Sequence, residues 1–296
     1  MMKRMERRNF IGAMAGALAA QTAPMPIIDI PQHTDYTGRP DDVLLKHQDL
    51  MGISKTILLP AGRTYGLEAG ASGNDRCVEV ARKHPDKYVF FANEVPYHPE
   101  ARQTIEKYLN MGALGIGEQK FFIDVQSAPM ELICSIAEHY NVPILLHFQY
   151  ERYNVNFDQF WRVLAKHPKV NFIGHAQTWW ANIDAQQPLE PSVLYPKGHV
   201  TAGGWSDRYL QDYPNMYGDL SAGSGLNALQ RDEEHARAFL TRNQDKLLYG
   251  SDCNDHFGQG PKCSGAQQIA EIKKLVPADI QRKIFSENAK KIIRLG

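Results

Sequence analysis

The sequence predicts an α/β protein folded as a single (β/α)8 TIM barrel with a C-terminal closing helix. Eight short apolar segments alternate with amphipathic helical patterns, and most are continuous apolar runs, which is typical of parallel strands covered by helices. Two of the segments end at His147 and His175, which lie 28 residues apart. That interval is about the length of one strand-helix unit, so the two histidines are expected at neighbouring strand ends.

The elements follow from this alternation. Strands are expected at residues 26–30, 55–59, 88–93, 113–117, 142–146, 170–174, 216–220 and 246–250. Helices are expected at residues 41–51, 75–83, 101–111, 130–140, 157–166, 233–243 and 266–275, with a closing segment at 279–295. Residues 181–214 are rich in Pro, Gly and Trp, which predicts a lid or an irregular helix pair. No glycine-rich phosphate-binding motif opens a helix, so a nucleotide-binding fold lacks support.

Length and charge favour one domain that acts on a small molecule. The chain has 296 residues, of which 43% are hydrophobic, and one barrel of about 250 residues uses such a length. Lys plus Arg and Asp plus Glu number 33 each, so no net charge points to nucleic acid or an acidic membrane. We expect a small-molecule substrate, no nucleic-acid partner and no membrane span, and a homo-oligomer is left open.

The first residues have the composition of an export signal. Four basic residues precede an apolar run of small residues at positions 10–20, namely Lys3, Arg4, Arg7 and Arg8. Arg7 to Ile11 resembles the twin-arginine signal, and the run is short for a transmembrane helix. We therefore expect residues 1–23 to be a signal peptide, residues 24–296 to be the barrel, and the bacterial periplasm to be the destination. The alternative is a frayed basic helix.

The four cysteines form no recognisable zinc or redox motif. Cys134 falls in an amphipathic helical pattern and is expected in the core. Cys253 and Cys263 could form a disulfide across a loop in an oxidising compartment, but sequence spacing alone does not supply the geometry.

Polar residues that could bind a metal stand at six expected strand ends. They are His33, Glu118, His147, His175, Asp219 and Asp252. The C-terminal ends of barrel strands converge on one face, so these side chains are expected to meet. Imidazole and carboxylate ligands suit one divalent ion, with zinc expected first and manganese or iron as alternatives. Taken singly, each histidine could be a hydrogen-bonded core residue, Asp252 a helix cap, and Glu118 a partner of Lys120.

Several of these segments resemble motifs of the amidohydrolase superfamily, in its amidohydrolase-related (type 2) branch. Ile28 to His33 resembles the Asp-x-His-x-His signature of the first strand, and Leu145 to His147 and Ile173 to His175 resemble the histidines of the fifth and sixth strands. Tyr249 to Asp252 resembles the aspartate motif of the eighth strand, and Glu287 to Ile292 resembles the closing helix. The resemblance runs from about Pro26 to the end of the chain.

The resemblance implies a metal-dependent hydrolase in which a metal-activated water attacks a lactone, amide or ester carbonyl. It implies that Asp252 accepts the proton, that His175 ligates the metal or polarises the carbonyl, and that His33 and His147 hold the ion. Pro31 stands where the family has its first histidine, and Glu118 resembles a fourth-strand glutamate ligand of TatD-like nucleases. A non-oxidative decarboxylase and a non-catalytic ligand-binding barrel are the alternatives.

Polar and aromatic residues follow both strand-end histidines and are expected above the site. Gln149, Tyr150 and Arg152 follow His147, and Gln177 and Trp179 follow His175. These five are predicted to bind a cyclic or carboxylated substrate by stacking and ion pairing. One tryptophan of the Trp179-Trp180 pair is expected to pack under the lid instead.

Overall fold

Eight parallel strands occur in chain order among the residues that the computed structural model describes, which are 24–62, 70–190 and 193–295. They are β1 (Ile28–Gln32), β2 (Lys55–Leu58), β3 (Tyr88–Phe90), β4 (Ile116–Gln119), β5 (Ile144–His147), β6 (Phe172–His175), β7 (Met216–Asp219) and β8 (Leu247–Leu248). The strands β1 to β3 form one sheet and β4 to β8 another, each strand pairing with the next in the chain. The expected order of strands is confirmed.

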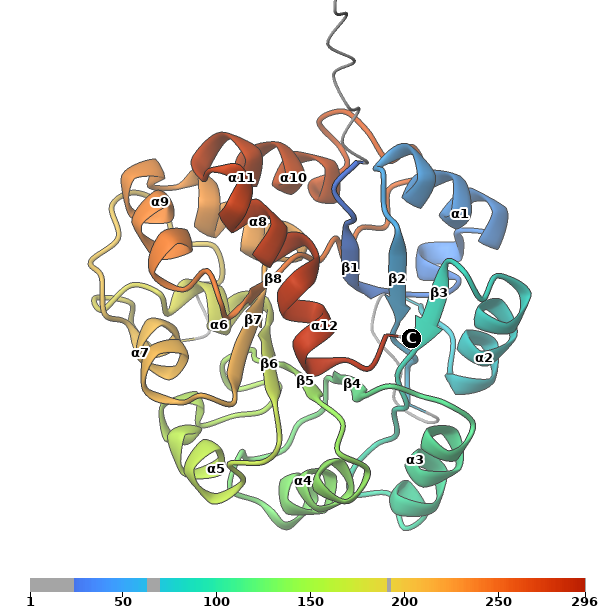
Figure 1. The fold of residues 1–296 in the computed structure, drawn as a ribbon. Helices are drawn as coiled ribbons and strands as arrows, with labels where there is room; N and C mark the ends of the chain where they lie inside the picture. The colour runs from blue at the N-terminus through green and yellow to red at the C-terminus, as the bar shows by residue number, and fades with distance from the viewer. Residues whose placement is uncertain (1–23, 63–69, 191–192, 296) are drawn as a thin grey trace, which may run out of the picture.

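Backbone hydrogen bonds bridge both gaps between the two sheets. The amide of Ala92, just after β3, donates to the carbonyl of Gly115 at 2.9 Å, and Ala92 forms a bridge with Ile116 of β4. At the other gap the amide of Ile30 in β1 donates to the carbonyl of Tyr249 after β8 at 3.1 Å. The strands therefore follow one another around a ring, with helices around it and α12 (Asn288–Ile292) across its middle (Figure 1).

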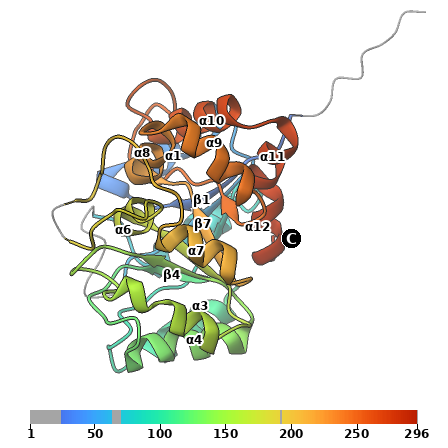
Figure 2. The same cartoon turned by 90° about the vertical axis from the view of Figure 1, so that its left-hand side faces the viewer.

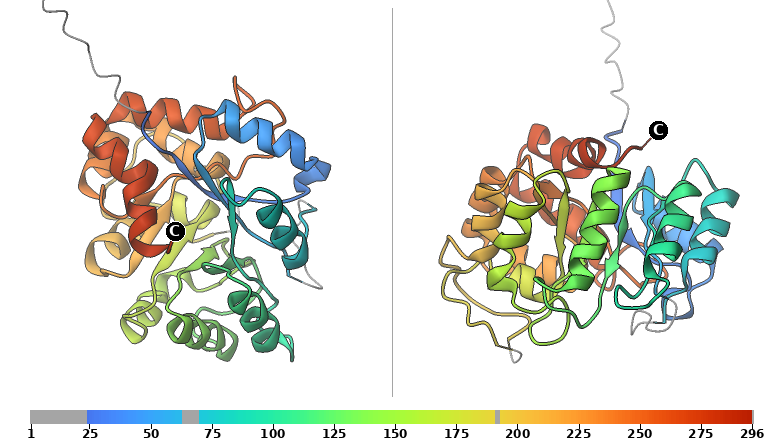
Figure 3. Two further views of the ribbon diagram at one scale, coloured as in Figure 1. Left: turned by 45° about the vertical axis from the view of Figure 1, so that its right-hand side comes forward. Right: turned by 90° about the horizontal axis from the view of Figure 1, so that it is seen from below.

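The helices lie between the strands and cover them. They are α1 (Asp41–Leu50), α2 (Asn74–Lys83), α3 (Ala101–Asn110), α4 (Ala128–Tyr140), α5 (Trp161–Lys166), α6 (Ala176–Ala181), α7 (Trp205–Asp212), α8 (Ala222–Gln230), α9 (Glu233–Arg242), α10 (Ser264–Leu275), α11 (Ala278–Arg282) and α12 (Asn288–Ile292). Three short turns of other helix types are η1 (Tyr36–Gly38), η2 (Phe157–Gln159) and η3 (Lys283–Glu287). Figure 3 shows these helices from two further directions.

Two helices were not expected from the sequence, α6 and α8. Glycines disfavour a helix, and α8 contains Gly223 and Gly225. A Cβ atom at Gly225 would lie 2.7 Å from the carbonyl carbon of Leu220, so close packing against the end of β7 explains the glycine. The expected irregular segment at 181–214 contains α7 near its end.

The closing helix packs against the inside of the barrel. Ala289, Ile292 and Ile293 of the C-terminal segment join a buried apolar cluster with barrel-interior residues such as Ile28 and Leu145. Figure 2 shows α12 on one side of the strands and α6, which directly follows His175, on the other. The helix α12 thus covers one end of the barrel, and the strand-end histidines lie toward the opposite end.

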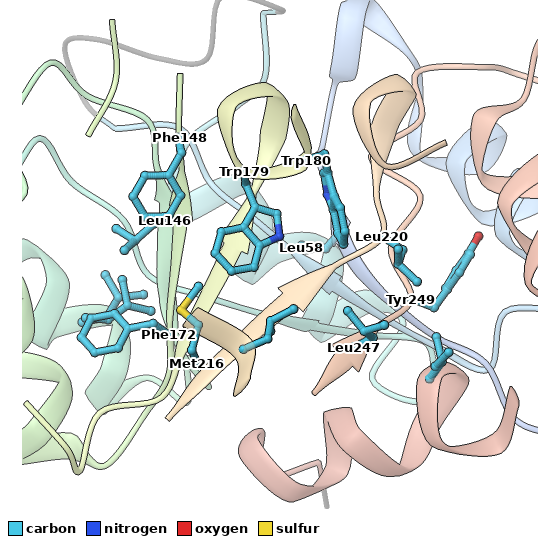
Figure 4. Packing of buried hydrophobic residues seen from close by; sticks show 14 of the residues in the cluster. Leu58, Leu146, Phe148, Phe172, Trp179, Trp180, Met216, Leu220, Leu247 and Tyr249 are labelled. Atoms are coloured by element: carbon cyan, nitrogen blue, oxygen red, sulfur yellow. The ribbon is translucent and has the colours of Figure 1, made fainter. Parts of the chain in front are cut away.

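A second cluster fills the space between the strands and the outer helices. Trp179 is fully buried in it, between Phe148 and Trp180 (Figure 4). A Cβ atom at Gly174 of β6 would lie 2.4 Å from the Trp179 ring, and one at Gly218 of β7 would lie 2.9 Å from its Nε1. The indole therefore lies flat on two strands that have no side chain at these positions.

No helix among the described residues is both long and apolar enough to cross a membrane. The expected signal peptide at residues 1–23 lies outside the part of the chain that the structure describes.

Candidate active site

The two strand-end histidines lie side by side. His147 and His175 are the last residues of β5 and β6, and they pair with each other in the parallel register. Their ring centroids are 5.2 Å apart, and both side chains are buried. Both strands extend one residue further than the apolar runs indicated, because each histidine takes the extended conformation and joins the ladder.

Glu118 of β4 is at the centre of the site. Its Oε1 accepts a hydrogen bond from Nδ1 of His147 and lies 3.4 Å from Nε2 of His175, and its Oε2 lies 3.5 Å from Nε2 of His33. Burial alone would raise the pKa of Glu118, but the adjacent imidazoles of His147 and His175 lower it well below its usual range. Glu118 therefore stays ionised and contacts all three histidines.

His33 directs one ring nitrogen into the site. Its Nδ1 lies 2.8 Å from the carbonyl oxygen of Leu59, which can only accept, so Nδ1 carries the proton. The lone pair of Nε2 then faces Glu118 and, at 3.3 Å, the Oδ1 atom of Asp252. This is the orientation of a metal-binding histidine that is held by a backbone carbonyl.

His175 is oriented by Asp219 of β7. Its Nδ1 lies 3.0 Å from Oδ1 of Asp219 and 2.8 Å from Oγ of Ser221, so Nε2 faces Glu118 and Asp252. Burial alone would lower the pKa of His175, but the carboxylates of Asp219, Glu118 and Asp252 outweigh it and raise that pKa to about 9.

Asp252 follows β8 and completes the set. Its Oδ2 lies 3.7 Å from Nε2 of His175, and its carboxylate lies close to the phenol of Tyr36. Its amide donates to the carbonyl of Pro31 at 3.0 Å, so the proline that replaces a family histidine contributes a backbone contact instead of a ligand. The nearby Asp252 charge raises the pKa of Tyr36, so its phenol stays protonated.

The residues fit a divalent metal ion. Glu118, His147 and His175 can each offer a ligand atom with all such atoms within 4.8 Å of one another. Nε2 of His147 and Oδ1 of Asp252 are buried without a hydrogen-bond partner, which is costly for a polar atom unless something binds it. The buried carboxylates of Glu118 and Asp219 and the partly buried carboxylate of Asp252 lie among three histidines, and a cation would balance their charge.

The expected substrate residues divide into two groups. Gln149, Tyr150 and Gln177 are partly exposed and Arg152 is exposed, all on the segments that follow β5 and β6. The expectation for Trp179 is wrong, because its ring is fully buried in the core and faces away from solvent. Trp179 is therefore a core residue and not a substrate-binding one, and Trp180 is buried as well.

Two contributors, Tyr36 and Ser221, were not predicted from the sequence, and Asp29 was predicted only as part of the first-strand motif. Tyr36, three residues after His33, stacks edge-on against that ring with centroids 4.9 Å apart and lies close to the Asp252 carboxylate. Ser221 reaches His175 across β7. Asp29 accepts hydrogen bonds from the amide and hydroxyl of Ser251, both at 2.6 Å, and so holds the segment before Asp252. Only their closeness to expected strand ends could have signalled them.

Buried imidazoles and carboxylates at the C-terminal ends of parallel barrel strands define a TIM-barrel protein with an enzyme-like site. The family model described as amidohydrolase matches residues 61–295. The chain belongs to the amidohydrolase family, in its type 2 branch, which confirms the resemblance seen in the motifs. No curated protein matches the chain.

Solved structures share the fold at low sequence identity. An uncharacterized TIM-barrel protein from Bordetella bronchiseptica has a TM-score of 0.63 at 15% identity, covering 90% of this chain and 98% of that one. A probable 2-pyrone-4,6-dicarboxylic acid hydrolase from Acinetobacter baumannii has a TM-score of 0.60 at 13% identity, with the same coverage. A 2,6-dihydroxybenzoate decarboxylase complexed with 2,6-dihydroxybenzoate has a TM-score of 0.56 at 15% identity, covering 92% and 99%. The TIM-barrel fold class is thereby confirmed.

Proposed function

We propose that this protein is a metal-dependent hydrolase that attacks the lactone, amide or ester carbonyl of a small carboxylated or cyclic substrate. One observation carries the proposal. The carboxylate of Asp252 stands between Nε2 of His33, at 3.3 Å, and Nε2 of His175, at 3.7 Å, with its Oδ1 free of hydrogen-bond donors. A partly buried base beside inward-facing imidazoles suits proton removal from water.

The site residues have two proposed roles: four of them bind a metal ion, and Asp252 accepts a proton. His33, Glu118, His147 and His175 would hold one divalent ion, zinc first and manganese or iron next, with Asp252 at its edge. Such an ion supplies a Lewis acid that makes water more acidic and a carbonyl more electrophilic. Asp252 accepts the proton of the attacking water, and the Tyr36 hydroxyl keeps that carboxylate in place.

Two cations near His147 favour a carboxylated substrate. The ring of Tyr153 lies edge-on to His147 with centroids 5.4 Å apart. The ammonium of Lys120 and the guanidinium of Arg152 lie 5.5 and 5.4 Å from the centre of that same ring. A substrate carboxylate above Tyr153 would meet positive charge while its carbonyl faces Asp252. The fold similarity to a probable 2-pyrone-4,6-dicarboxylic acid hydrolase supports this class, since that substrate name describes a dicarboxylated lactone.

A decarboxylase is the second candidate, because a 2,6-dihydroxybenzoate decarboxylase shares the fold. Parallel assays separate the two reactions. We expect loss of the ring absorbance of 2-pyrone-4,6-dicarboxylate and no carbon dioxide from 2,6-dihydroxybenzoate. Carbon dioxide release without ring opening would replace the hydrolase proposal by the decarboxylase.

Elemental analysis of protein purified without chelators tests the metal requirement. We expect a stoichiometric divalent ion whose amount falls in His147→Ala together with hydrolysis. The matched control is His139→Ala, because His139 is exposed on α4. A wild-type protein with no barrel-site ion and no turnover of any ester or lactone would indicate the non-catalytic binding barrel instead.

We also propose that residues 1–23 direct export through the twin-arginine route to the periplasm, because Arg7 and Arg8 precede an apolar run. Cell fractionation tests this. The native chain is expected in the periplasm and a variant with Arg7→Lys and Arg8→Lys in the cytoplasm, whereas equal distributions would contradict the proposal.

A further inference from the structure

A second group of potential metal ligands lies apart from the acidic strand-end site. His47 of α1, Cys253 and Cys263 are all buried, and their ligand atoms lie within 4.8 Å of one another. Sγ of Cys253 is 3.7 Å from Sγ of Cys263, and Sγ of Cys263 is 3.5 Å from Nε2 of His47. Both cysteines are free thiols. The three residues come from two parts of the chain about 210 positions apart.

These separations match the edges of a tetrahedral zinc site. With Zn–S bonds of about 2.3 Å and a Zn–N bond of about 2.0 Å, tetrahedral angles place two sulfurs ~3.8 Å apart and a sulfur and a nitrogen ~3.5 Å apart. A disulfide needs sulfur atoms at about 2.05 Å, which is far shorter than the 3.7 Å between Cys253 and Cys263. The spacing therefore suits an ion held between the two sulfurs.

The His47 ring is oriented as a zinc ligand would be. Its Nδ1 lies 2.9 Å from Oε1 of Gln48. The amide nitrogen of Gln48 is committed elsewhere, since it donates to Asp29 and Thr56, both at 2.7 Å. The oxygen of Gln48 therefore faces Nδ1 and accepts its proton, which leaves the Nε2 lone pair directed at Cys263.

The sulfur of Cys263 lies at the start of a helix, where a backbone amide points at it. Cys263 is the N-cap of the twelve-residue helix α10, and its sulfur accepts a hydrogen bond from the amide of Ala266 at 3.3 Å. Backbone amides at a helix N-terminus stabilise a negative charge, and the thiolate is the form that binds metal.

The carboxylate of Asp255 lies beside His47, outside the group of three mutually close ligand atoms. Oδ2 of Asp255 lies 3.9 Å from Nε2 of His47, and its side chain is 6% exposed. The amides of Phe257 and Gly258 donate to the same oxygen at 2.9 and 2.8 Å, which fixes its position.

We propose that His47, Cys253 and Cys263 form a structural zinc site, separate from the ion of the proposed active site. Zinc would replace the two thiol protons and join α1 to the loop between β8 and α10. That loop also carries Asp252, the residue directly before Cys253. The site would thus hold the loop that carries the proposed base, and it takes no part in the reaction itself.

Cobalt substitution tests the proposal independently of the proposed function, because no cysteine belongs to the catalytic ligand set. The full chain is prepared with a thiol reductant, stripped, and loaded with Co²⁺ as the probe. Thiolate-to-cobalt charge-transfer absorption in the near ultraviolet is expected in the wild type and in His147→Ala. It is expected to disappear in Cys263→Ala and to persist in Cys134→Ala, the control for a buried cysteine of α4.

The zinc content of the protein and the oxidation state of Cys253 and Cys263 provide two further tests. Zinc-loaded wild type should show Zn–S distances of about 2.3 Å by X-ray absorption, a measurement that needs no variant to fold. Cys263→Ala should carry one zinc fewer than Cys134→Ala. Absence of thiolate-to-cobalt absorption in the wild type, or a Cys253–Cys263 disulfide found by mass spectrometry in protein isolated without reductant, would overturn the proposal.

Discussion

The carboxylate of Asp219 lies 3.0 Å from Nδ1 of His175, and this contact determines which nitrogen of the ring faces the site. Both residues end neighbouring strands, β7 and β6. Because the carboxylate draws the Nδ1 proton, Nε2 is left toward Glu118 and Asp252. The strand register thereby fixes the orientation of a proposed catalytic residue.

Replacing Asp219 by asparagine should lower activity without unfolding the protein. Asp219→Asn keeps the shape but removes the charge that orients the His175 ring, so kcat is expected to fall roughly 10- to 100-fold with less change in KM. Steady-state kinetics measure kcat and KM, and zinc titration measures the affinity of the variant for its metal. Asp86→Asn is the control, since Asp86 is exposed. A wild-type kcat in Asp219→Asn would show that the contact does not position His175.

Tyr36→Phe should weaken catalysis through Asp252. The phenol lies close to the Asp252 carboxylate, and we expect it to donate to this base during turnover. Loss of one hydrogen bond to a charged group costs about 1.5–3 kcal/mol, or roughly a 10- to 150-fold fall in kcat/KM. The variant should bind its metal normally, since Tyr36 is not a proposed ligand. An unchanged kcat/KM would remove Tyr36 from the site, and Tyr97→Phe, at an exposed tyrosine, is the comparison.

Substitutions at Trp179 and Gln177 should have different effects, the first on stability and the second on substrate binding. Trp179 is fully buried, so Trp179→Ala is expected to reduce the free energy of unfolding by about 3–5 kcal/mol. Gln177 is partly exposed near the site, so Gln177→Ala should raise KM and leave stability within about 0.5 kcal/mol. Denaturant unfolding and kinetics on both variants check this. A stable Trp179→Ala with a raised KM would reverse the two assignments.

Asp29 should make stability depend on pH. Burial raises the pKa of Asp29 from 3.8 to about 6, against hydrogen bonds from Gln48 and Ser251 and the charge of His47, which lower it. Because the folded state holds this proton more tightly than the unfolded chain, the added stability is complete below about pH 4 and is lost as pH rises through about 6. A shift of about two pKa units corresponds to about 3 kcal/mol.

Urea unfolding between pH 4 and 7 measures the contribution of Asp29 protonation to the free energy of unfolding. The decline in stability with rising pH should be shallower in Asp29→Asn than in the wild type, because asparagine does not titrate. Equal slopes would mean that Asp29 does not bind its proton in the folded state. Asp86→Asn again serves as the control, because an exposed carboxyl should leave the slope unchanged.

The residue pattern by itself determined the order of the strands and the histidines that end two of them. Buried parallel strands require continuous apolar runs, and such a run is a local property of the sequence. It therefore predicts the strands at Ile144 to Leu146 and at Phe172 to Gly174 without knowledge of the fold. The convergence of strand ends then predicted that His33, Glu118, His147, His175 and Asp252 would meet, and the structure brings them together.

Only the tertiary structure decided which side chains face the site and which fill the core. Trp179 turns inward because Gly174 and Gly218 leave room on two neighbouring strands, a fact that no local pattern contains. The α8 helix forms despite its glycines because packing against Leu220 outweighs propensity. Tyr36 reaches Asp252, and His47 reaches Cys263, across more than 200 residues. Such contacts depend on how distant segments pack, and short-range periodicity does not encode that.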